Sequence, residues 1–355
     1  YIGFFQAEDG IRDAGGAGVL VLGLCLGMKP GNIPWDVIMI IGSVIAAISA
    51  MQLAGGLEYL VYIAEKILYK NPKYINYLAP IVTYVLTIFA GTGHTAFSMI
   101  PVIVEVAKGE NIRPSVPLSM SVVSSQVAIT ASPVSAAAIF MTGALEPFGW
   151  SYPTLLGIWI LTTFVGCMLT AFIMTHISKL DLSSDPIYQE RLKEGLVKPP
   201  VGLQEMVITP TAKLSVWIFL VGVLCVVAYA SAISPAVGLI KPVVVPRDAA
   251  IISLMLAVGA LITIFCKIKL GDVAGTSVFK SGMVACICVL GVAWLGDTFV
   301  SGHTKEIKDF ASHTISQYPA LLAIVFFLAS MLLYSQAATA KGITPTVISS
   351  LGITT

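Results

Sequence analysis

Charged residues are scarce in this 355-residue chain, and their scarcity excludes an ordinary soluble domain. Asp, Glu, Lys and Arg make up 11% of the residues and hydrophobic residues 57%, whereas about one quarter of a typical soluble domain is charged. The formal net charge is +1, so the chain also lacks the basic excess that binds a phosphate backbone, and we expect no nucleic-acid partner. With a mean hydropathy of +0.90, the composition predicts a polytopic protein of the lipid bilayer that handles small solutes.

Enzyme signatures are missing as well. The sequence has no GxxxxGK[ST] loop, no HExxH and no GxSxG, the patterns that mark phosphate-binding loops, zinc proteases and serine hydrolases. Its six cysteines show no CxxC spacing, which argues against a zinc site or a dense disulfide framework. Acidic pairs are absent from the apolar stretches, so a carboxylate proton relay has no groups to use. We therefore expect neither an enzyme nor an ATP-driven pump, and no cofactor or metal.

Long apolar stretches dominate what is present, and they predict an all-α fold because only helices and closed barrels span lipid. A spanning helix needs about 20 apolar residues. The apolar stretches cover residues 15–28, 36–54, 75–90, 96–107, 116–142, 153–178, 213–233, 249–266, 277–296 and 320–340. The two stretches around the loop 91–95 are too short to span separately, which favours a hairpin or a broken helix with that loop at membrane depth.

The polar stretches divide the chain. Residues 179–212 carry many charges and the pair Pro199-Pro200, so we interpret them as a polar linker, and their Lys and Arg place it in the cytoplasm by the positive-inside rule. Competing basic clusters leave the full topology open. The linker separates a first transmembrane repeat, residues 14–178, from a second, residues 213–355. We expect residues 1–13, a charged patch before an apolar run, to be a non-native extension, and the second repeat to be truncated at its C-terminus.

Two local patterns recur in the same order in both halves. Residues 57–69 have the polar–apolar pattern of an amphipathic helix at the membrane interface, with Glu65 on its polar side, and residues 305–318 are similar. A Gly-His-Thr triplet lies near each, at 93–95 and 302–304. Such short patterns can recur by chance in a biased composition, but their common order and membrane placement favour inverted repeats.

A polar interruption of an apolar stretch also occurs once in each half, at residues 125–133 and 335–345. Each begins with Ser-Gln and ends with a hydroxyl residue before proline. Polar, helix-breaking sequence at membrane depth is tolerated only where protein or a water-filled cavity surrounds it. Two such breaks, one per half, are typical of secondary transporters with a binding site at the membrane midplane.

The breaks supply candidate binding groups for a small dianion. Ser132 before Pro133 has the pattern of an N-cap followed by proline at the first helical position, and Thr344 precedes Pro345 in the same way. Helix N-termini attract anions through free N–H groups and the helix dipole. Lys341 could pair with a carboxylate at depth, or it could extend to the interface from a helix that ends earlier.

Other polar residues near the loops complete the candidate site. Gln126 and Gln336 can donate and accept hydrogen bonds, although such side chains also join transmembrane helices to one another. His94 could titrate near neutral pH, but a structural hydrogen bond is at least as good an explanation. The full set of candidate substrate-binding residues is Thr92, Gly93, His94, Ser125, Gln126, Ser132, Pro133, Gln336, Lys341 and Thr344.

Several longer motifs resemble the anaerobic C4-dicarboxylate uptake (Dcu) transporter family of bacterial inner membranes. The resemblance runs from about residue 15 to the end. It rests on Lys70-Asn71-Pro72-Lys73-Tyr74, Leu86-Thr87-Ile88-Phe89-Ala90-Gly91-Thr92-Gly93-His94, Asn111-Ile112-Arg113-Pro114, Ala131-Ser132-Pro133-Val134-Ser135 and Ser335-Gln336-Ala337-Ala338-Thr339-Ala340-Lys341.

This resemblance implies exchange of fumarate, malate or aspartate for succinate during anaerobic fumarate respiration, without ATP or a prosthetic group. It also implies the inverted-repeat, broken-helix architecture of the wider ion-transporter superfamily. Some members of the family associate with a membrane sensor kinase, but the residues for that role would fall in the C-terminal part that we expect to be absent. The sequence leaves open whether the protein is a homo-oligomer.

We thus predict an all-α, multi-pass inner-membrane antiporter that binds a C4-dicarboxylate between its two breaks. Two alternatives stay open at this point. One is a sodium- or proton-coupled carrier of another organic anion, which would depend on a cation gradient rather than on a counter-substrate. The other is an accessory protein that binds dicarboxylate for a sensor kinase without moving it. An intramembrane enzyme has the least support, because no nucleophile, base and orienting group occur together.

Overall fold

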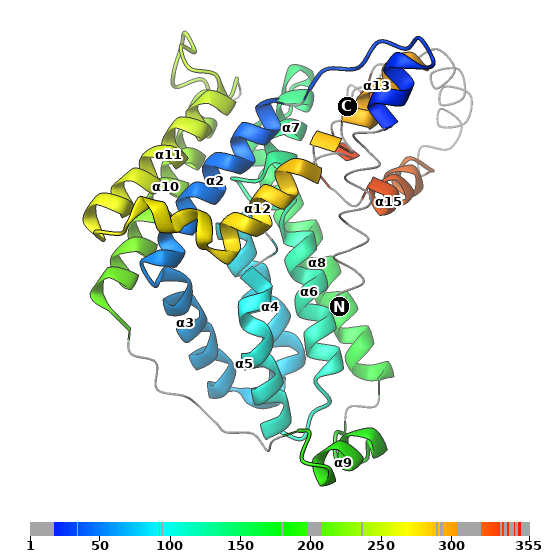
Figure 1. Cartoon of the computed structure of the whole chain (residues 1–355), viewed down its shortest axis with the longest axis vertical. Helices are drawn as coiled ribbons and strands as arrows, with labels where there is room; N and C mark the ends of the chain where they lie inside the picture. Colours follow the sequence, from blue (N-terminus) through cyan, green and yellow to red (C-terminus); the bar gives the residue numbers. More distant parts are fainter. Residues whose placement is uncertain are drawn as a thin grey trace.

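The computed structural model describes most of the chain and shows a bundle of helices (Figure 1). The residues it describes are 18–33, 35–91, 93, 95–178, 181–197, 208–235, 237–288, 290–291, 294–303, 321–333, 336, 339–340, 344 and 347–348. Within them, β-type backbone pairing is limited to an isolated bridge between Ile112 and Asp181. The predicted all-α fold is confirmed.

Most of the helices follow the apolar stretches of the sequence, whereas 56–70 and 186–193 are helices outside those stretches. In chain order they are α2 (Trp35–Leu53), α3 (Gly56–Lys70), the 3-10 turn η1 (Pro72–Tyr74), α4 (Ile75–Ala90), α5 (Thr95–Gly109), α6 (Ser115–Ala128), α7 (Ala136–Leu145), η2 (Glu146–Phe148), α8 (Tyr152–Ile177), α9 (Pro186–Lys193), α10 (Pro210–Ala232), α11 (Arg247–Phe265), η3 (Leu270–Gly275), α12 (Ser277–Cys288), α13 (Trp294–Gly302) and α15 (Leu321–Leu333).

Five helical segments of the described chain are long and apolar enough to cross a membrane. They are Trp35–Leu53, Pro72–Ala90, Tyr152–Ile177, Pro210–Ala232 and Arg247–Phe265. On α8, large apolar side chains such as Leu161, Leu169 and Ile177 are 58–76% exposed. Such a surface on a spanning helix is suited to contact with lipid.

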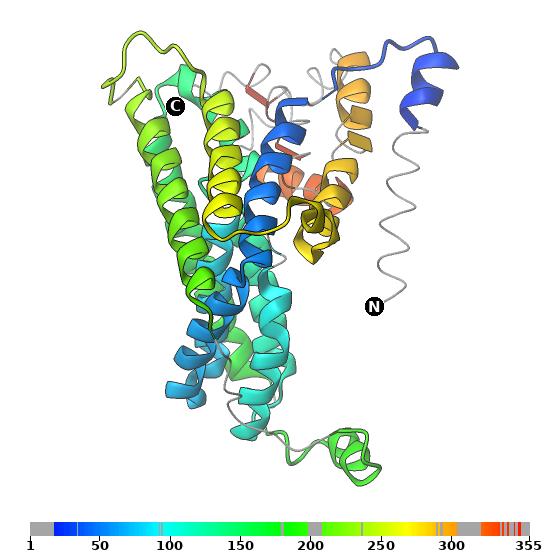
Figure 2. The same ribbon diagram turned by 60° about the vertical axis from the view of Figure 1, so that its left-hand side comes forward.

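Two groups of helices make up the body of the molecule. α2 packs against α10, α11 and α12, and the buried side chains between them include Ile48, Phe219 and Met255. α4 packs against α5, α6 and α8, with a second apolar cluster where α3, α4 and α5 meet. In Figures 1 and 2 these groups occupy opposite ends of the long axis, and α7 lies in the upper group beside α2.

The short stretches on either side of the loop 91–95 form a helical hairpin, as expected. α4 ends at Ala90, where Gly91 adopts a left-handed conformation with φ of 66° and its N–H donates to the Thr87 carbonyl. Glycine takes this conformation without the steric penalty that a side chain carries. α5 then runs back along α4, and α6 returns along both (Figure 1).

The predicted break in the first half is also present. The apolar stretch 116–142 forms two helices, because α6 ends at Ala128 and α7 begins at Ala136. The residues between them form turns rather than helix. In the second half, α12 ends at Cys288 and α13 begins at Trp294, and the described residues between them, 290–291, are in π-helical geometry.

The burial of α3 differs from the amphipathic pattern read from its sequence. Glu65 was expected on the polar side, yet it is only 5% exposed, whereas Ile63 and Ile67 are 38% and 43% exposed. The reason is that α3 is packed against α10 and α5 as well as α4. Tertiary packing therefore covers the carboxylate and leaves the two isoleucines at the surface.

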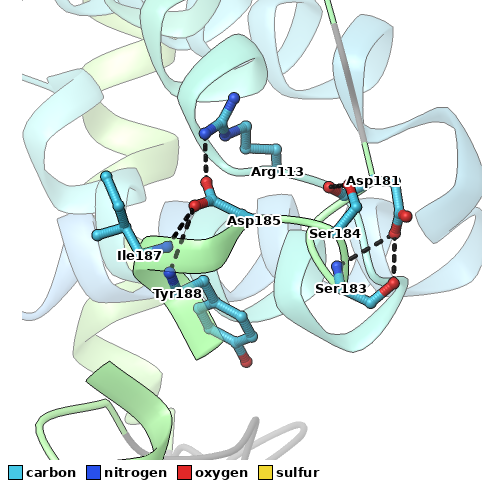
Figure 3. A network of polar contacts seen from close by, with 7 residues as sticks. All are labelled: Arg113, Asp181, Ser183, Ser184, Asp185, Ile187 and Tyr188. Carbon is cyan, nitrogen blue, oxygen red and sulfur yellow. Dashed lines mark hydrogen bonds and ion pairs between the residues drawn. The ribbon is translucent and has the colours of Figure 1, made fainter. Parts of the chain in front are cut away.

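The predicted linker contains a short helix that is attached to the first half. Asp185 caps α9 by accepting from the N–H groups of Ile187 and Tyr188, and it pairs with Arg113 in the turn between α5 and α6 (Figure 3). Asn111 in the same turn donates to Asp181 at 2.7 Å. Residues 181–185 of the linker thus lie against the α5–α6 turn, and α10 begins at Pro210 with Thr209 as its N-cap.

These contacts lower the pKa values of both carboxyl groups. The pKa of Asp181 is lowered by a hydrogen bond from the Ser183 side chain, with further bonds from the Ser183 N–H and Asn111. Desolvation by itself would raise the pKa of Asp185, but hydrogen bonds from Arg113 and the α9 N–H groups hold it below its ordinary value. Both acids are therefore charged at neutral pH.

Candidate functional site

The tip of the α4–α5 hairpin meets the break between α6 and α7. The Ser132 hydroxyl in the break donates to the carbonyl of Ile88, in the last turn of α4, at 2.6 Å. Gly91, at the tip, lies so close to Val134 that an added Cβ would be 2.8 Å from its Cγ2 atom. The two non-helical segments thus form one junction inside the bundle.

A chain of hydroxyl groups connects the hairpin tip to α6. The Thr87 hydroxyl donates to Ser125 Oγ at 3.2 Å, and the Ser125 hydroxyl donates to the Gly93 carbonyl at 2.8 Å. Ser125 is fully buried. The Gly93 carbonyl also accepts from the Ala96 N–H at 3.2 Å, so the serine provides its second hydrogen bond and ties α6 to the hairpin tip.

Gly93 also lies directly against the Gln126 side chain. A Cβ built on Gly93 would be 2.6 Å from Gln126 Nε2 and 3.1 Å from its Oε1. The absence of a side chain at this position lets the Gln126 amide lie over the tip of the hairpin. Ser125 and Gln126 therefore belong to the last turn of α6 and face the tip, rather than forming part of the break itself.

Residues of the second predicted break contact the first. Gln336 Nε2 donates to the Gln126 carbonyl at 2.6 Å. The Thr344 hydroxyl donates to the sulfur of Met141, on α7, at 3.1 Å. Gln336 and Thr344 therefore lie against α6 and α7 respectively, on the two sides of the break.

The prediction of Ser132 as the N-cap of the helix after the break is wrong, because the N-cap lies three residues later. α7 begins at Ala136, and its N-cap is Ser135, whose Oγ accepts from the Ala138 N–H at 3.2 Å. Ser132 instead donates to α4, and Pro133 lies in the turn before the cap. The serine–proline pattern located the break correctly, but packing against the hairpin gave Ser132 a different partner.

Three candidate residues, Thr92, His94 and Lys341, lie outside the described residues. The junction brings together six of the remaining candidates, which are Gly93, Ser125, Gln126, Ser132, Pro133 and Gln336, whereas Thr344 lies farther along α7, at Met141. Two participants were missed by the sequence analysis. Thr87 could have been noticed as a hydroxyl in the last turn before the loop, whereas Tyr152, which donates to the Pro133 carbonyl at 3.1 Å, has no local signal.

A cavity of about 520 Å³ lies along α7, beginning at its first residue, Ala136. It is lined by one face of α7 from Ala136 to Ala144, by Val37 of α2, and by the carboxylates of Asp36 and Asp248. Most of this lining is apolar, and the two carboxylates would repel a dianion. The cavity wall therefore offers a dianion no matching set of donor groups.

The N-terminus of one helix and the C-termini of two others lie at the junction, and the dipoles at these two kinds of terminus have opposite signs. The N-terminus of α7 presents N–H groups that have no partner within the helix, and its dipole favours negative charge. The C-termini of α4 and α6 end at Ala90 and Ala128, and helix C-termini favour positive charge. Donor groups from the Gln126 and Gln336 side chains add to this polar environment, which suits a small ion enclosed by protein.

Comparison with known proteins identifies the family. The family described as anaerobic C4-dicarboxylate membrane transporter matches residues 2–355. The chain is 64% identical to "C4-dicarboxylate transporter DcuA" of Helicobacter pylori (strain J99 / ATCC 700824) over 344 residues, 97% of this chain and 77% of that protein.

Relatives with lower sequence identity are also named C4-dicarboxylate transporters. The protein of the same name from Escherichia coli (strain K12) is 53% identical over 97% of this chain and 79% of its own length. "Anaerobic C4-dicarboxylate transporter DcuB" of Escherichia coli O6:H1 is 35% identical over 94% of this chain and 77% of its own length. No solved structure matches. The chain belongs to the anaerobic C4-dicarboxylate membrane transporter family, and it is a multi-pass transporter protein of the bacterial inner membrane rather than an enzyme.

Proposed function

We propose that this transporter works as an antiporter that takes up fumarate, malate or aspartate in exchange for succinate under anaerobic conditions, and that it binds the dicarboxylate at the junction of the hairpin tip and the α6–α7 break. The observation that carries this proposal is the convergence of the tip, the break and Gln336 of the second half, through Ser132, Ser125 and Gln126. The hairpin tip and the α6–α7 break leave helical geometry at the same place, and Gln336, which is itself in helical geometry, contacts the end of α6 there.

The chemistry of the junction fits a C4-dicarboxylate. A dianion of this size carries a carboxylate at each end, so it needs two donor groups a few ångströms apart. The N-terminus of α7 supplies one set of N–H donors, and the side-chain amides of Gln126 and Gln336 supply another. Lys341 is proposed to neutralise one carboxylate, and Thr92, His94 and Thr344 to complete the enclosure.

Exchange follows if the loaded site changes its exposure easily and the empty one does not. A ligand shifts a conformational equilibrium only through its different affinity for the two states. Removing a dianion would leave the donors of the junction without that partner, which is costly wherever protein covers them. The empty carrier is therefore expected to reorient slowly, so that transport requires a substrate on each side.

The proposal is tested by uptake of labelled succinate into proteoliposomes that contain fumarate or only buffer. Uptake that requires internal fumarate supports antiport. Equal uptake into both kinds of vesicle excludes obligatory exchange.

Lys341→Gln is expected to weaken binding of dianions more than binding of monoanions, and an unchanged charge preference would remove Lys341 from the site.

One observation favours a second candidate, a cation-coupled carrier. The C-termini of α4 and α6 and the carbonyl of Gly93 lie at the junction, and carbonyl groups at broken helices bind coupling ions in other transporters. Uptake driven by an imposed sodium or proton gradient, without internal dicarboxylate, would establish this alternative.

Clear binding of succinate without flux would instead indicate an accessory protein of a membrane sensor kinase. Chemical cross-linking in the membrane would test for that kinase and for a homo-oligomer.

A further inference from the structure

A buried ion pair connects the second half of the chain to the far end of α7. The guanidinium of Arg247, the first residue of α11, donates to Glu146 Oε1 at 2.7 Å. Glu146 directly follows α7, and the two residues are 101 positions apart in sequence. The Arg247 side chain is only 7% exposed and that of Glu146 is 21% exposed, so this pair is largely removed from water.

The same guanidinium lies over the ring of Tyr152. Its Cζ atom is 5.4 Å from the ring centroid, within the range of a cation–π contact. Tyr152 is fully buried, and its hydroxyl donates to the Pro133 carbonyl at 3.1 Å. A continuous set of contacts thus leads from Glu146 through Arg247 and Tyr152 to the break.

Helix stability does not explain these two charges. Glu146 is a negative group at the C-terminal end of α7, and Arg247 is a positive group at the N-terminal end of α11. Each has the sign that the dipole of its own helix disfavours. A buried ion pair, moreover, is often no more stabilising than apolar side chains of the same volume. The pair is therefore a candidate for a role beyond stability.

We propose that Arg247 and Tyr152 are positioning residues for the dicarboxylate site: Arg247, held by Glu146, fixes the Tyr152 ring, and the Tyr152 hydroxyl fixes the Pro133 carbonyl and with it the geometry of the break. This inference rests on the proposed binding site at the junction. It also assigns a route by which the second half of the chain controls the binding geometry of the first. Neither residue contacts the substrate.

Two variants separate positioning from simple structural support. Tyr152→Phe removes only the hydroxyl and keeps the ring. The double variant Glu146→Gln/Arg247→Met removes both charges and keeps the side-chain volumes close to the original. The matched control is Tyr84→Phe, because Tyr84 is also buried and its hydroxyl donates to a backbone carbonyl, that of Ile160 in α8, at 2.9 Å.

The first measurement needs no substrate. Hydrogen exchange of the backbone amides in residues 129–135 is compared by mass spectrometry in the purified full chain. Faster exchange in Tyr152→Phe and in the double variant, with no change in Tyr84→Phe, is the expected result. Unchanged exchange in both variants would overturn the proposal, whether or not the junction binds dicarboxylate.

The second measurement is the succinate Kd with the melting temperature recorded beside it. Losing one hydrogen bond corresponds to a weakening of about twofold to tenfold, so Tyr152→Phe is expected to raise the Kd in that range. The double variant should raise the Kd without lowering the melting temperature. Lower melting temperatures with the wild-type Kd, as expected for Tyr84→Phe, would show a purely structural role. If the wild-type chain binds no succinate, the proposed function fails, and hydrogen exchange still decides the positioning role.

Discussion

Substituting Gly93 by alanine tests whether the Gln126 amide takes part in binding. The added Cβ would lie 2.6 Å from Gln126 Nε2, and ordinary contacts begin at 3.4 Å, so the amide must retreat by about 0.8 Å. The atom that must move is the far end of a flexible side chain, and Gly93 does not have the positive φ seen at Gly91. Gly93→Ala should therefore fold normally while displacing this one amide.

The expected size of the effect follows from side-chain geometry. Forcing a side chain about 30° from its rotamer costs about 0.5–1.5 kcal/mol. If binding requires the original position of the amide, this cost corresponds to a succinate Kd raised by about twofold to tenfold. The melting temperature in detergent should change little, because the strained group can move aside.

Isothermal titration with succinate, combined with uptake into proteoliposomes, measures this effect. Gly166→Ala is the matched control, because Gly166 is on α8 and a Cβ there meets nothing within 4 Å. A second control places Gly93→Ala in a Gln126→Ala background, where the two effects should not add, because they share one side chain. An unchanged Kd in Gly93→Ala, or full additivity with Gln126→Ala, would refute the role of this amide.

Three further predictions concern packing, the linker and the helix after the break. Gly222→Ala should lower stability by about 1–3 kcal/mol, seen as a lower melting temperature, because its Cβ would be 2.1 Å from the branched side chain of Val258 across the α10–α11 interface. The pKa of Asp185 is lowered, so its contact with Arg113 contributes its full stabilisation above the unfolded pKa of about 3.9 and loses it as the pH falls through the lower folded pKa. Proteolysis of the linker should therefore increase only on strong acidification in the wild-type chain. In Arg113→Gln it should increase already at neutral pH. Ser135→Ala should cost about 0.5–2 kcal/mol as the loss of an N-cap, and no change in melting temperature would contradict the cap assignment.

Local sequence was sufficient to predict the apolar helices and the interruption in the first half. An apolar stretch such as 153–178 has few ways to satisfy its backbone in lipid other than helix, and α8 occupies almost the same residues. The short stretches around Gly91 indicated a hairpin by length, and the serine–proline pattern indicated the break at Pro133. These features depend on residues that are neighbours in the chain, so the sequence alone contains them.

Tertiary structure decided which groups meet at the junction. Ser132 has the local pattern of an N-cap, but the end of α4 lies close enough to accept its hydroxyl, and Ser135 caps α7 instead. The burial of Glu65 and the pairing of Arg247 with Glu146 likewise depend on helices that are distant in sequence. Hydropathy and helix signals report each segment's own preference for lipid or helix, whereas a hydrogen-bond partner is chosen by the packing of segments against one another. The sequence by itself therefore determined the helices and the place of the break, and only the packed structure decided the contacts that shape the candidate site.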